Sequence, residues 1–250
     1  PVVAGGEDTS SAGLSSGAVR EGLAFLSLGT AGTVYVPTNQ QAVHPQLLTF
    51  LHVLPGQYLV GGSMAALGAS LSWCHQVLGA QLDFEEMLAL AERSEPGAGR
   101  LIFLPYMSGE LQPINDGYAR GMLFGLSLST RKEDIVRAIL EGTAFAVAHN
   151  LSIIESLGIR IREVRAVGGP TRSVLWSQVI ADIIGRPLHV VSSDGGVPLG
   201  NALLAAKGVG LIEDPADAAL GAARIERSYL PDAGLSDLYH ELFDIYRQLY

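Results

Sequence analysis

The chain has 250 residues, of which 48% are hydrophobic and 16% charged, with 30 glycines and a formal net charge of −9. This length and apolar content predict an α/β protein with a sizeable buried core and exclude a disordered chain. Because a polyanion requires a basic surface, the negative charge and the 16 Lys and Arg residues exclude a nucleic-acid-binding protein. Small molecules are therefore the expected partners.

The cysteine and histidine content bears on compartment and metal binding. The single cysteine, Cys74, excludes an internal disulfide and fits a reducing compartment. The six histidines lack the paired spacing of a zinc site, so we expect no metal held by protein ligands alone. The N-terminus has no signal-peptide pattern, and polar residues such as His75 and Asn150 interrupt the apolar segments, so we expect a cytoplasmic protein without membrane contact. The chain begins with Pro1 rather than Met, which suggests a fragment.

Apolar runs and turn residues predict the elements of the first half. Residues 1–6 predict a strand that ends in Gly5 and Gly6 and is followed by the acidic pair Glu7 and Asp8. Asp8 fits two interpretations, because an acid after a strand either caps the next helix or faces a ligand at the sheet edge. Further predicted elements are strands at 24–28, 34–37 and 58–61, a helix capped by Ser63 that stops at Gly79, and a helix that starts with Asp83 and Glu86 and runs to about Arg93.

The second half continues the alternation of strands and helices. Its predicted elements are strands at 101–106 and 122–128 around a binding or lid loop at 107–120, a helix capped by Thr130 and Glu133 that runs to Leu157 and Gly158, a helix at 199–206 opened by Pro198, a minor helix from Pro215, and an amphipathic C-terminal helix. The C-terminal helix packs on its own domain or on a second subunit of a homodimer, and periodicity does not distinguish these. Because no linker divides the chain, we expect one domain over residues 1–250.

Two glycine turns are candidate nucleotide sites. The first lies between the strands at 24–28 and 34–37 and contains Gly29, Thr30, Gly32 and Thr33. The second, Gly168 and Gly169, lies in a βαβ unit whose strands are 164–167 and 188–192 and whose helix begins near Ser173. Glycine backbones allow close approach of phosphates, and a helix N-terminus offers free N–H groups. For each turn by itself, an ordinary ligand-free connection is the commoner interpretation.

The order and spacing of these segments across the whole chain resemble the C-terminal domain of the FGGY carbohydrate kinases, most closely their xylulokinase branch. The matching segments are residues 2–8, 27–32, 104–110 with 119–121, Gly125 with 134–142, and 167–169 with Ser173 and Trp176. The resemblance implies an α/β fold of the actin-like ATPase (ribonuclease H-like) type, with a mixed sheet flanked by helices. It also implies that residues 1–250 form the nucleotide-binding domain, while the N-terminal sugar-binding domain is absent from this chain. Ala31 and Pro170 depart from the family pattern without removing an essential side chain.

The resemblance also implies roles for individual residues. Asp8 would be the catalytic base, and Gly168, Gly169 and Ser173 would lie beside the adenosine. The phosphates would be held by Gly29, Thr30, Gly32 and Thr33. ATP and Mg²⁺ are the implied cofactors, with no metal-ligating residue predicted. Other residues of the matching segments, Tyr106, Glu110, Arg120 and Glu141, fit loop-fixing or helix-packing roles and are left outside the predicted site.

The implied activity is ATP-dependent phosphorylation of a sugar by the complete protein, with the isolated half nearly inactive. The expected acceptor is a ketopentose, D-xylulose, and the alternatives are gluconate, glycerol, ribulose or another polyol. A second class of function stays open, namely a non-catalytic nucleotide-binding module of the same fold.

Overall fold

The computed structural model describes residues 2–78, 81–192 and 196–250, and its main feature is a seven-stranded mixed sheet. The strand order is β3-β4-β2-β1-β7-β8-β9, in which β1, β7 and β8 are parallel and the other pairs are antiparallel. The strands are β1 (Leu23–Leu28), β2 (Gly32–Thr38), β3 (Leu48–Leu51), β4 (Tyr58–Met64), β7 (Glu163–Val167), β8 (Leu188–Val191) and β9 (Ile225–Tyr229). A separate hairpin pairs β5 (Ile102–Leu104) with β6 (Met122–Phe124).

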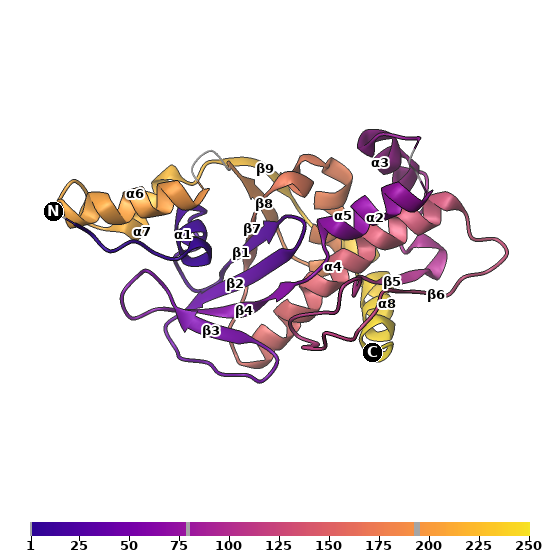
Figure 1. The fold of residues 1–250 in the computed structure, drawn as a ribbon, viewed down its shortest axis with the longest axis horizontal. Helices are drawn as coiled ribbons and strands as arrows, with labels where there is room; N and C mark the ends of the chain where they lie inside the picture. Colours follow the sequence, from indigo (N-terminus) through magenta and orange to yellow (C-terminus); the bar gives the residue numbers. More distant parts are fainter. Residues whose placement is uncertain (1, 79–80, 193–195) are drawn as a thin grey trace.

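Helices cover the sheet on two sides (Figure 1). They are α1 (Asp8–Ser15), α2 (Gly68–Leu78), α3 (Phe84–Glu92), α4 (Lys132–Ser156), α5 (Val174–Ile184), α6 (Gly196–Gly208), α7 (Pro215–Ala222) and α8 (Ser236–Gln248). One sheet face, with Leu26, Val34 and Val164, packs in the main core with residues of α4 and α5. The other face carries Phe25, Tyr35 and Arg165, and Arg165 Nη1 donates to the carbonyl of Ser16 at the end of α1. The helices α1, α6 and α7 pack together at the end of the molecule that carries the N-terminus.

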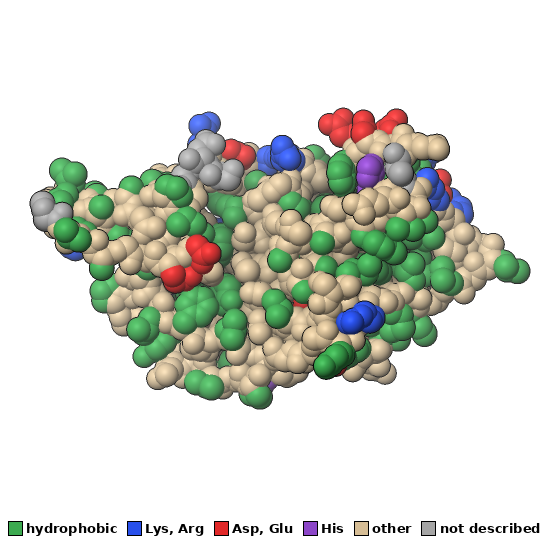
Figure 2. Space-filling view, in the orientation of Figure 1, with side chains coloured by type: hydrophobic (Ala, Val, Ile, Leu, Met, Phe, Trp, Pro, Cys, Tyr) green, Lys and Arg blue, Asp and Glu red, His purple; other side chains and the backbone are tan. Residues whose placement is uncertain are grey.

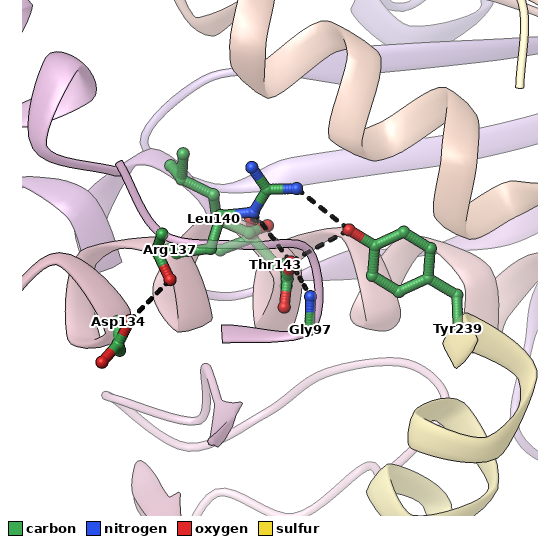
Figure 3. Close-up of polar contacts among 8 residues, drawn as sticks. Gly97, Asp134, Arg137, Leu140, Thr143 and Tyr239 are labelled. Carbon is green, nitrogen blue, oxygen red and sulfur yellow. Dashed lines mark hydrogen bonds and ion pairs between the residues drawn. The ribbon is translucent and has the colours of Figure 1, made fainter. Parts of the chain in front are cut away.

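The longest helix, α4, has 25 residues and forms the centre of the core. Its buried Arg137 and Glu141 form an ion pair of 2.8 Å between Nε and Oε1. Tyr239 of α8 donates its hydroxyl to the same Oε1, 3.0 Å away, and accepts from Arg137 Nη2, as Figure 3 shows. The Gly97 amide is a third donor to Glu141. Glu141 thus connects α4, α8 and the 97–100 turn, which is the helix-packing role that the sequence left open.

Most predicted elements are present, and several local signals are confirmed. Asp83 and Glu86 each accept the other's backbone N–H at 2.8 Å, which is the capping box of α3. Ser173 accepts from the Trp176 amide at 3.1 Å and caps α5. Gly158 has φ +81° and directly follows the C-cap of α4.

Other predictions are wrong, because tertiary contacts replace the local signal. Residues 2–7 form no strand, and the Gly6 amide donates to the Asn201 side chain at 2.7 Å instead of to a neighbouring strand. Ser63 is not a helix cap but a strand residue paired with Thr33. The cap of α4 lies one residue later than predicted, since the Asp134 carboxylate accepts from the Arg131 amide.

Further differences concern strand number and boundaries. The edge strands β3 and β9 were not predicted, and the strands predicted at 101–106 and 122–128 are shortened to β5 and β6. The helix predicted from 199 already includes Gly196. The predicted helix stop at Gly79 lies outside the described residues.

Candidate active site

The two glycine turns lie side by side at one edge of the sheet. The parallel strands β1 and β7 place Ser27 opposite Val167, so both strands end at the same edge and each glycine turn begins there. A Cβ atom at Gly168 would lie 2.7 Å from the carbonyl carbon of Leu28 and even closer to its oxygen. The register of this one strand pair therefore brings together two turns that are more than 130 residues apart.

Glycine is required at position 168 by the backbone as well as by this contact. Gly168 has φ 112° and ψ 172°, a conformation that is essentially limited to glycine. Thr171 Oγ1 donates to the Gly168 carbonyl at 2.6 Å and stabilises the turn before α5 begins. Gly169 is different, because the nearest atom to a Cβ there would be Arg172 Nη2 at 3.9 Å. The backbone at Gly169 is therefore open to a ligand.

The first turn is fixed against the start of α2. The Gly68 and Ala69 amides donate to the carbonyls of Gly29 and Thr30 at 2.9 and 3.0 Å. Gly29, Thr30 and Ala31 are exposed, and the Thr30 and Ala31 amides donate to no other residue in the described part of the chain. Exposed turn amides can bind anionic oxygens. Gly32, in contrast, is buried and packs against the Leu67 side chain.

Next to this edge, a row of hydroxyl side chains lies across three neighbouring strands on one face of the sheet. Ser27, Thr33 and Ser63 are direct cross-strand partners on β1, β2 and β4, so their side chains project from one face. Each of the three is half-buried. Tyr35, two residues further along β2, adds its hydroxyl 3.4 Å from Ser63 Oγ. Sequence reasoning identified Thr33 but missed the others, because only strand register reveals that they are neighbours.

Asp8 is the first residue of α1, and Glu7 is the N-cap. The Glu7 carboxylate accepts from the Ser10 amide at 2.6 Å, so the capping role left open for Asp8 belongs to its neighbour. Asp8 is exposed, and its Oδ1 accepts from the Thr9 amide at 2.7 Å. Acidic side chains gather over α1 beside hydrophobic ones in Figure 2.

The charges of this acidic pair act on the hydroxyl row. The pKa of Tyr35 is raised, first by burial and then by the negative charges of Glu7 and Asp8. A hydrogen bond with the Glu7 side chain, followed by the Thr9 amide, holds the pKa of Asp8 below its ordinary value. Asp8 is therefore ionised at neutral pH and able to accept a proton. Tyr35 and Ser63 lie on the sheet face whose Arg165 contacts the end of α1, the helix that begins with Asp8, and the two glycine turns lie at one edge of the sheet.

A cavity of about 400 Å³ lies against the second glycine turn. It is lined by Gly168 and Gly169, by the end of β8, and by Glu226 and Arg227 of β9. Arg227 Nη2 donates to the Thr171 carbonyl at 3.3 Å and supports the turn. Ser173 does not line the cavity, and its Oγ caps α5. The size of the cavity suits a nucleoside.

Polar contacts hold the loop at 107–120, and Tyr106 just before it, in place. Glu110 Oε1 accepts from the Ala65 and Leu111 amides, each at 2.8 Å. Arg120 donates to the carbonyl of Ala119, and Tyr106 donates to the hydroxyl of Tyr246. These contacts give Tyr106, Glu110 and Arg120 the loop-fixing roles that the sequence indicated as one alternative.

The described residues also bear on metal and membrane binding. Residues 2–78, 81–192 and 196–250 contain no group of three or more His, Cys, Asp or Glu side chains able to hold a metal ion. A magnesium ion that travels with a nucleotide needs only one or two carboxylates besides the phosphates, so the residues present are compatible with it. In the same ranges, no helix has both the length and the hydropathy of a membrane span.

Comparison with known proteins agrees with this architecture. The model of the FGGY family of carbohydrate kinases, C-terminal domain, matches residues 24–209. Xylulose kinase of Escherichia coli (strain K12) is 33% identical over 261 residues, which cover 100% of this chain and 52% of the relative. The crystal structure of xylulose kinase from Rhodospirillum rubrum superposes with a TM-score of 0.89 at 32% identity, over 97% of this chain and 49% of that one. The crystal structure of gluconate kinase from Lactobacillus acidophilus superposes with a TM-score of 0.91 at 26% identity, over 97% of this chain and 49% of that one. The chain spans about half the length of the curated relatives it matches.

Proposed function

Because the chain belongs to the FGGY family of carbohydrate kinases, we propose that it is the nucleotide-binding half of an ATP-dependent sugar kinase. Its mixed sheet flanked by helices is the actin-like ATPase fold of that family. The proposed reaction of the complete protein is transfer of the γ-phosphoryl group of ATP to a hydroxyl of D-xylulose. The observation that carries the proposal is the contact between the two glycine turns at one sheet edge, beside the cavity at Gly169.

The proposed roles follow from the exposure and charge of each residue. The amides of the exposed residues Thr30 and Ala31, with the Thr33 hydroxyl, would bind phosphate oxygens. Gly168 and Gly169 would form the wall beside the nucleoside, and Ser173 would act only through the first turn of α5. Gly32 contributes to the shape of the turn rather than to a phosphate contact, because Leu67 covers it.

Asp8 is the proposed general base. Its ionised carboxylate would accept the proton of the sugar hydroxyl as that oxygen attacks the γ-phosphorus. Phosphoryl transfer depends mainly on alignment and on neutralising charge at the phosphate oxygens, so one aspartate and a set of amides suffice on the protein side. Mg²⁺, when bound with ATP, supplies further neutralisation of the phosphate charge.

The N-terminal half of the complete protein is proposed to supply the sugar site and the remaining phosphate contacts. Alignment of reacting groups is worth about 7–11 kcal/mol in well-oriented reactions, so the isolated chain should be nearly inactive. A reducing, cytoplasmic location is part of the proposal, and the free, buried thiol of Cys74 supports it.

The test is turnover of the full-length protein with ATP and D-xylulose. Asp8→Asn should lower kcat by about 10²–10⁴-fold, because it removes the proton acceptor with little change in shape. Asp237→Asn is the matched control, since it makes the same change at an exposed carboxylate of α8 and should retain most of kcat. Normal turnover of Asp8→Asn would exclude Asp8 as the base.

The acceptor is tested separately with a panel of sugars. Gluconate is the second candidate, because the gluconate kinase structure superposes with a TM-score of 0.91. If the protein prefers gluconate, glycerol or ribulose over D-xylulose, the proposed acceptor sugar is wrong and the proposed kinase activity is retained. Calorimetry that detects ATP binding by the full-length protein, without turnover of any sugar, would instead indicate a non-catalytic nucleotide-binding module.

A further inference from the structure

The β4–α2 connection, residues 64–69, holds the first glycine turn in place. Met64 is the last residue of β4, and it pairs with Gly32 of the turn. The first two residues of α2 donate their amides to the carbonyls of Gly29 and Thr30 at 2.9 and 3.0 Å. The turn is thus bonded to both ends of the connection, so a shift of the connection moves the turn.

A side chain from a different part of the chain contacts this connection. Glu110, in the loop between β5 and β6, accepts a hydrogen bond from the Ala65 amide at Oε1, 2.8 Å away. The same oxygen accepts from the Leu111 amide at 2.8 Å, which fixes the carboxylate to its own loop. Gln112 extends this attachment along β4, because its amide donates to the Ser63 carbonyl at 2.9 Å and its Oε1 accepts from the Ser63 amide at 3.0 Å. Glu110 therefore joins the loop to the connection that carries the turn.

Glu110 is buried, and one of its carboxylate oxygens has no partner. The residue is 3% exposed, and its Oε2 is a buried atom without a hydrogen bond in the part of the chain that the structure describes. Tyr106 and Tyr246 lie near it, and their pKa values are raised mainly by burial, with a smaller contribution from the Glu110 charge. His149 of α4, which contacts the Tyr246 ring, is neutral because burial lowers its pKa to about 4. The Asp116 carboxylate, opposite Glu110 in the loop, is already hydrogen-bonded there, and the connection itself contains no titratable side chain. None of these groups supplies a positive charge to Glu110.

We propose that Glu110 is a positioning residue for the first glycine turn. The hydrogen bond that it accepts from Ala65 keeps the β4–α2 connection, and through it the exposed Thr30 and Ala31, where their amides bind phosphate oxygens. Loss of this bond displaces the turn and weakens binding of the phosphate groups, while the nucleoside cavity at Gly169 is unchanged. The inference rests on the proposed nucleotide site, to which it adds a residue outside the site.

The neutral and ionised forms of Glu110 differ in how well they hold the connection. Burial outweighs the two backbone hydrogen bonds and raises the pKa of Glu110 from 4.5 to about 7. Its ionised fraction therefore rises from about one-tenth at pH 6 to about nine-tenths at pH 8. A buried charge without a partner is costly, so ionisation favours rotation of the carboxylate toward water and away from the Ala65 amide. Phosphate binding should therefore weaken as the pH rises through this range.

Isothermal titration calorimetry of the full-length protein with two ligands tests this role at pH 6. The ligands are the β,γ-imido analogue of ATP, which is not hydrolysed, and adenosine, which has no phosphate. Glu110→Ala leaves the Ala65 amide without its acceptor and should weaken binding of the ATP analogue by about tenfold or more. Adenosine should bind within about twofold of its wild-type affinity. Glu85→Ala, the same change at an exposed residue of α3, is the matched control and should leave both affinities within about twofold. An equal loss for both ligands in Glu110→Ala would indicate general loosening of the fold and overturn the proposal.

Glu110→Gln is a second variant that keeps an acceptor for the Ala65 amide and cannot ionise, and it decides the question if Glu110→Ala does not fold. Between pH 6 and pH 8 the affinity of the wild type for the ATP analogue, divided by that of Glu110→Gln, should fall by about threefold or more. This ratio cancels the titration of the analogue's own phosphates. A constant ratio overturns the proposal, and so does wild-type affinity of Glu110→Ala for the ATP analogue. If the wild type binds neither ligand, the proposed nucleotide site is itself wrong and the inference falls with it.

Discussion

Gly168→Ala should destabilise the protein strongly, because the added methyl group is opposed both by the backbone conformation and by the neighbouring strand. The conformation at φ 112° and ψ 172° costs a residue with a side chain about 1–3 kcal/mol. The new Cβ would also lie 2.7 Å from the Leu28 carbonyl carbon, closer than real Cβ contacts occur. Moving two paired strands apart to relieve such overpacking costs about 1–3 kcal/mol more.

The two costs predict a loss of about 2–6 kcal/mol in the free energy of unfolding. Urea unfolding followed by far-UV circular dichroism measures this loss. Gly169→Ala is the matched control, because its Cβ meets only Arg172 Nη2 at 3.9 Å. The control should stay within about 0.5 kcal/mol of the wild type. If Gly168→Ala were as stable as Gly169→Ala, the close contact between the two turns would not exist.

Three further changes test other parts of the structure. Glu141→Gln should lower the free energy of unfolding, measured with urea, by about 3–5 kcal/mol, because Arg137 then stays buried without its counter-charge. A loss below 1 kcal/mol would contradict a stabilising role of this ion pair. Burial raises the pKa of Glu110 from 4.5 to about 7, so between these pH values the folded state holds a proton that the unfolded state has lost. The shift contributes about 3 kcal/mol to the free energy of unfolding below pH 4.5, and this contribution is lost as the pH rises to 7. Glu110→Gln should flatten the stability profile in that range, whereas the exposed Glu85→Gln should not. Ser173→Ala removes the cap of α5 and should lower the melting temperature through a loss of about 1 kcal/mol, which calorimetry measures.

Interactions within a few residues were predictable from the sequence. The capping box of α3 and the serine cap of α5 depend on hydrogen bonds between residues three apart, so the residue pattern alone identifies them. The same holds for Gly158 after α4, because only the local backbone demands a positive φ there. The resemblance that led to the family likewise depends on motifs readable along the chain, from Asp8 to Trp176.

The tertiary structure decided which segments pair and therefore where side chains meet. The edge strands β3 and β9 carry no clear alternation, and they are strands because β4 and β8 offer free backbone groups beside them. Ser63 looks like a helix cap in the sequence, yet its pairing with Thr33 makes it part of the hydroxyl row. Strand register is set by contacts between segments far apart in the chain, and a local pattern carries no information about it. The sequence thus determined most of the helices, the caps of α3 and α5 and the two glycine turns, while the parallel pairing of β1 with β7 decided that these turns touch.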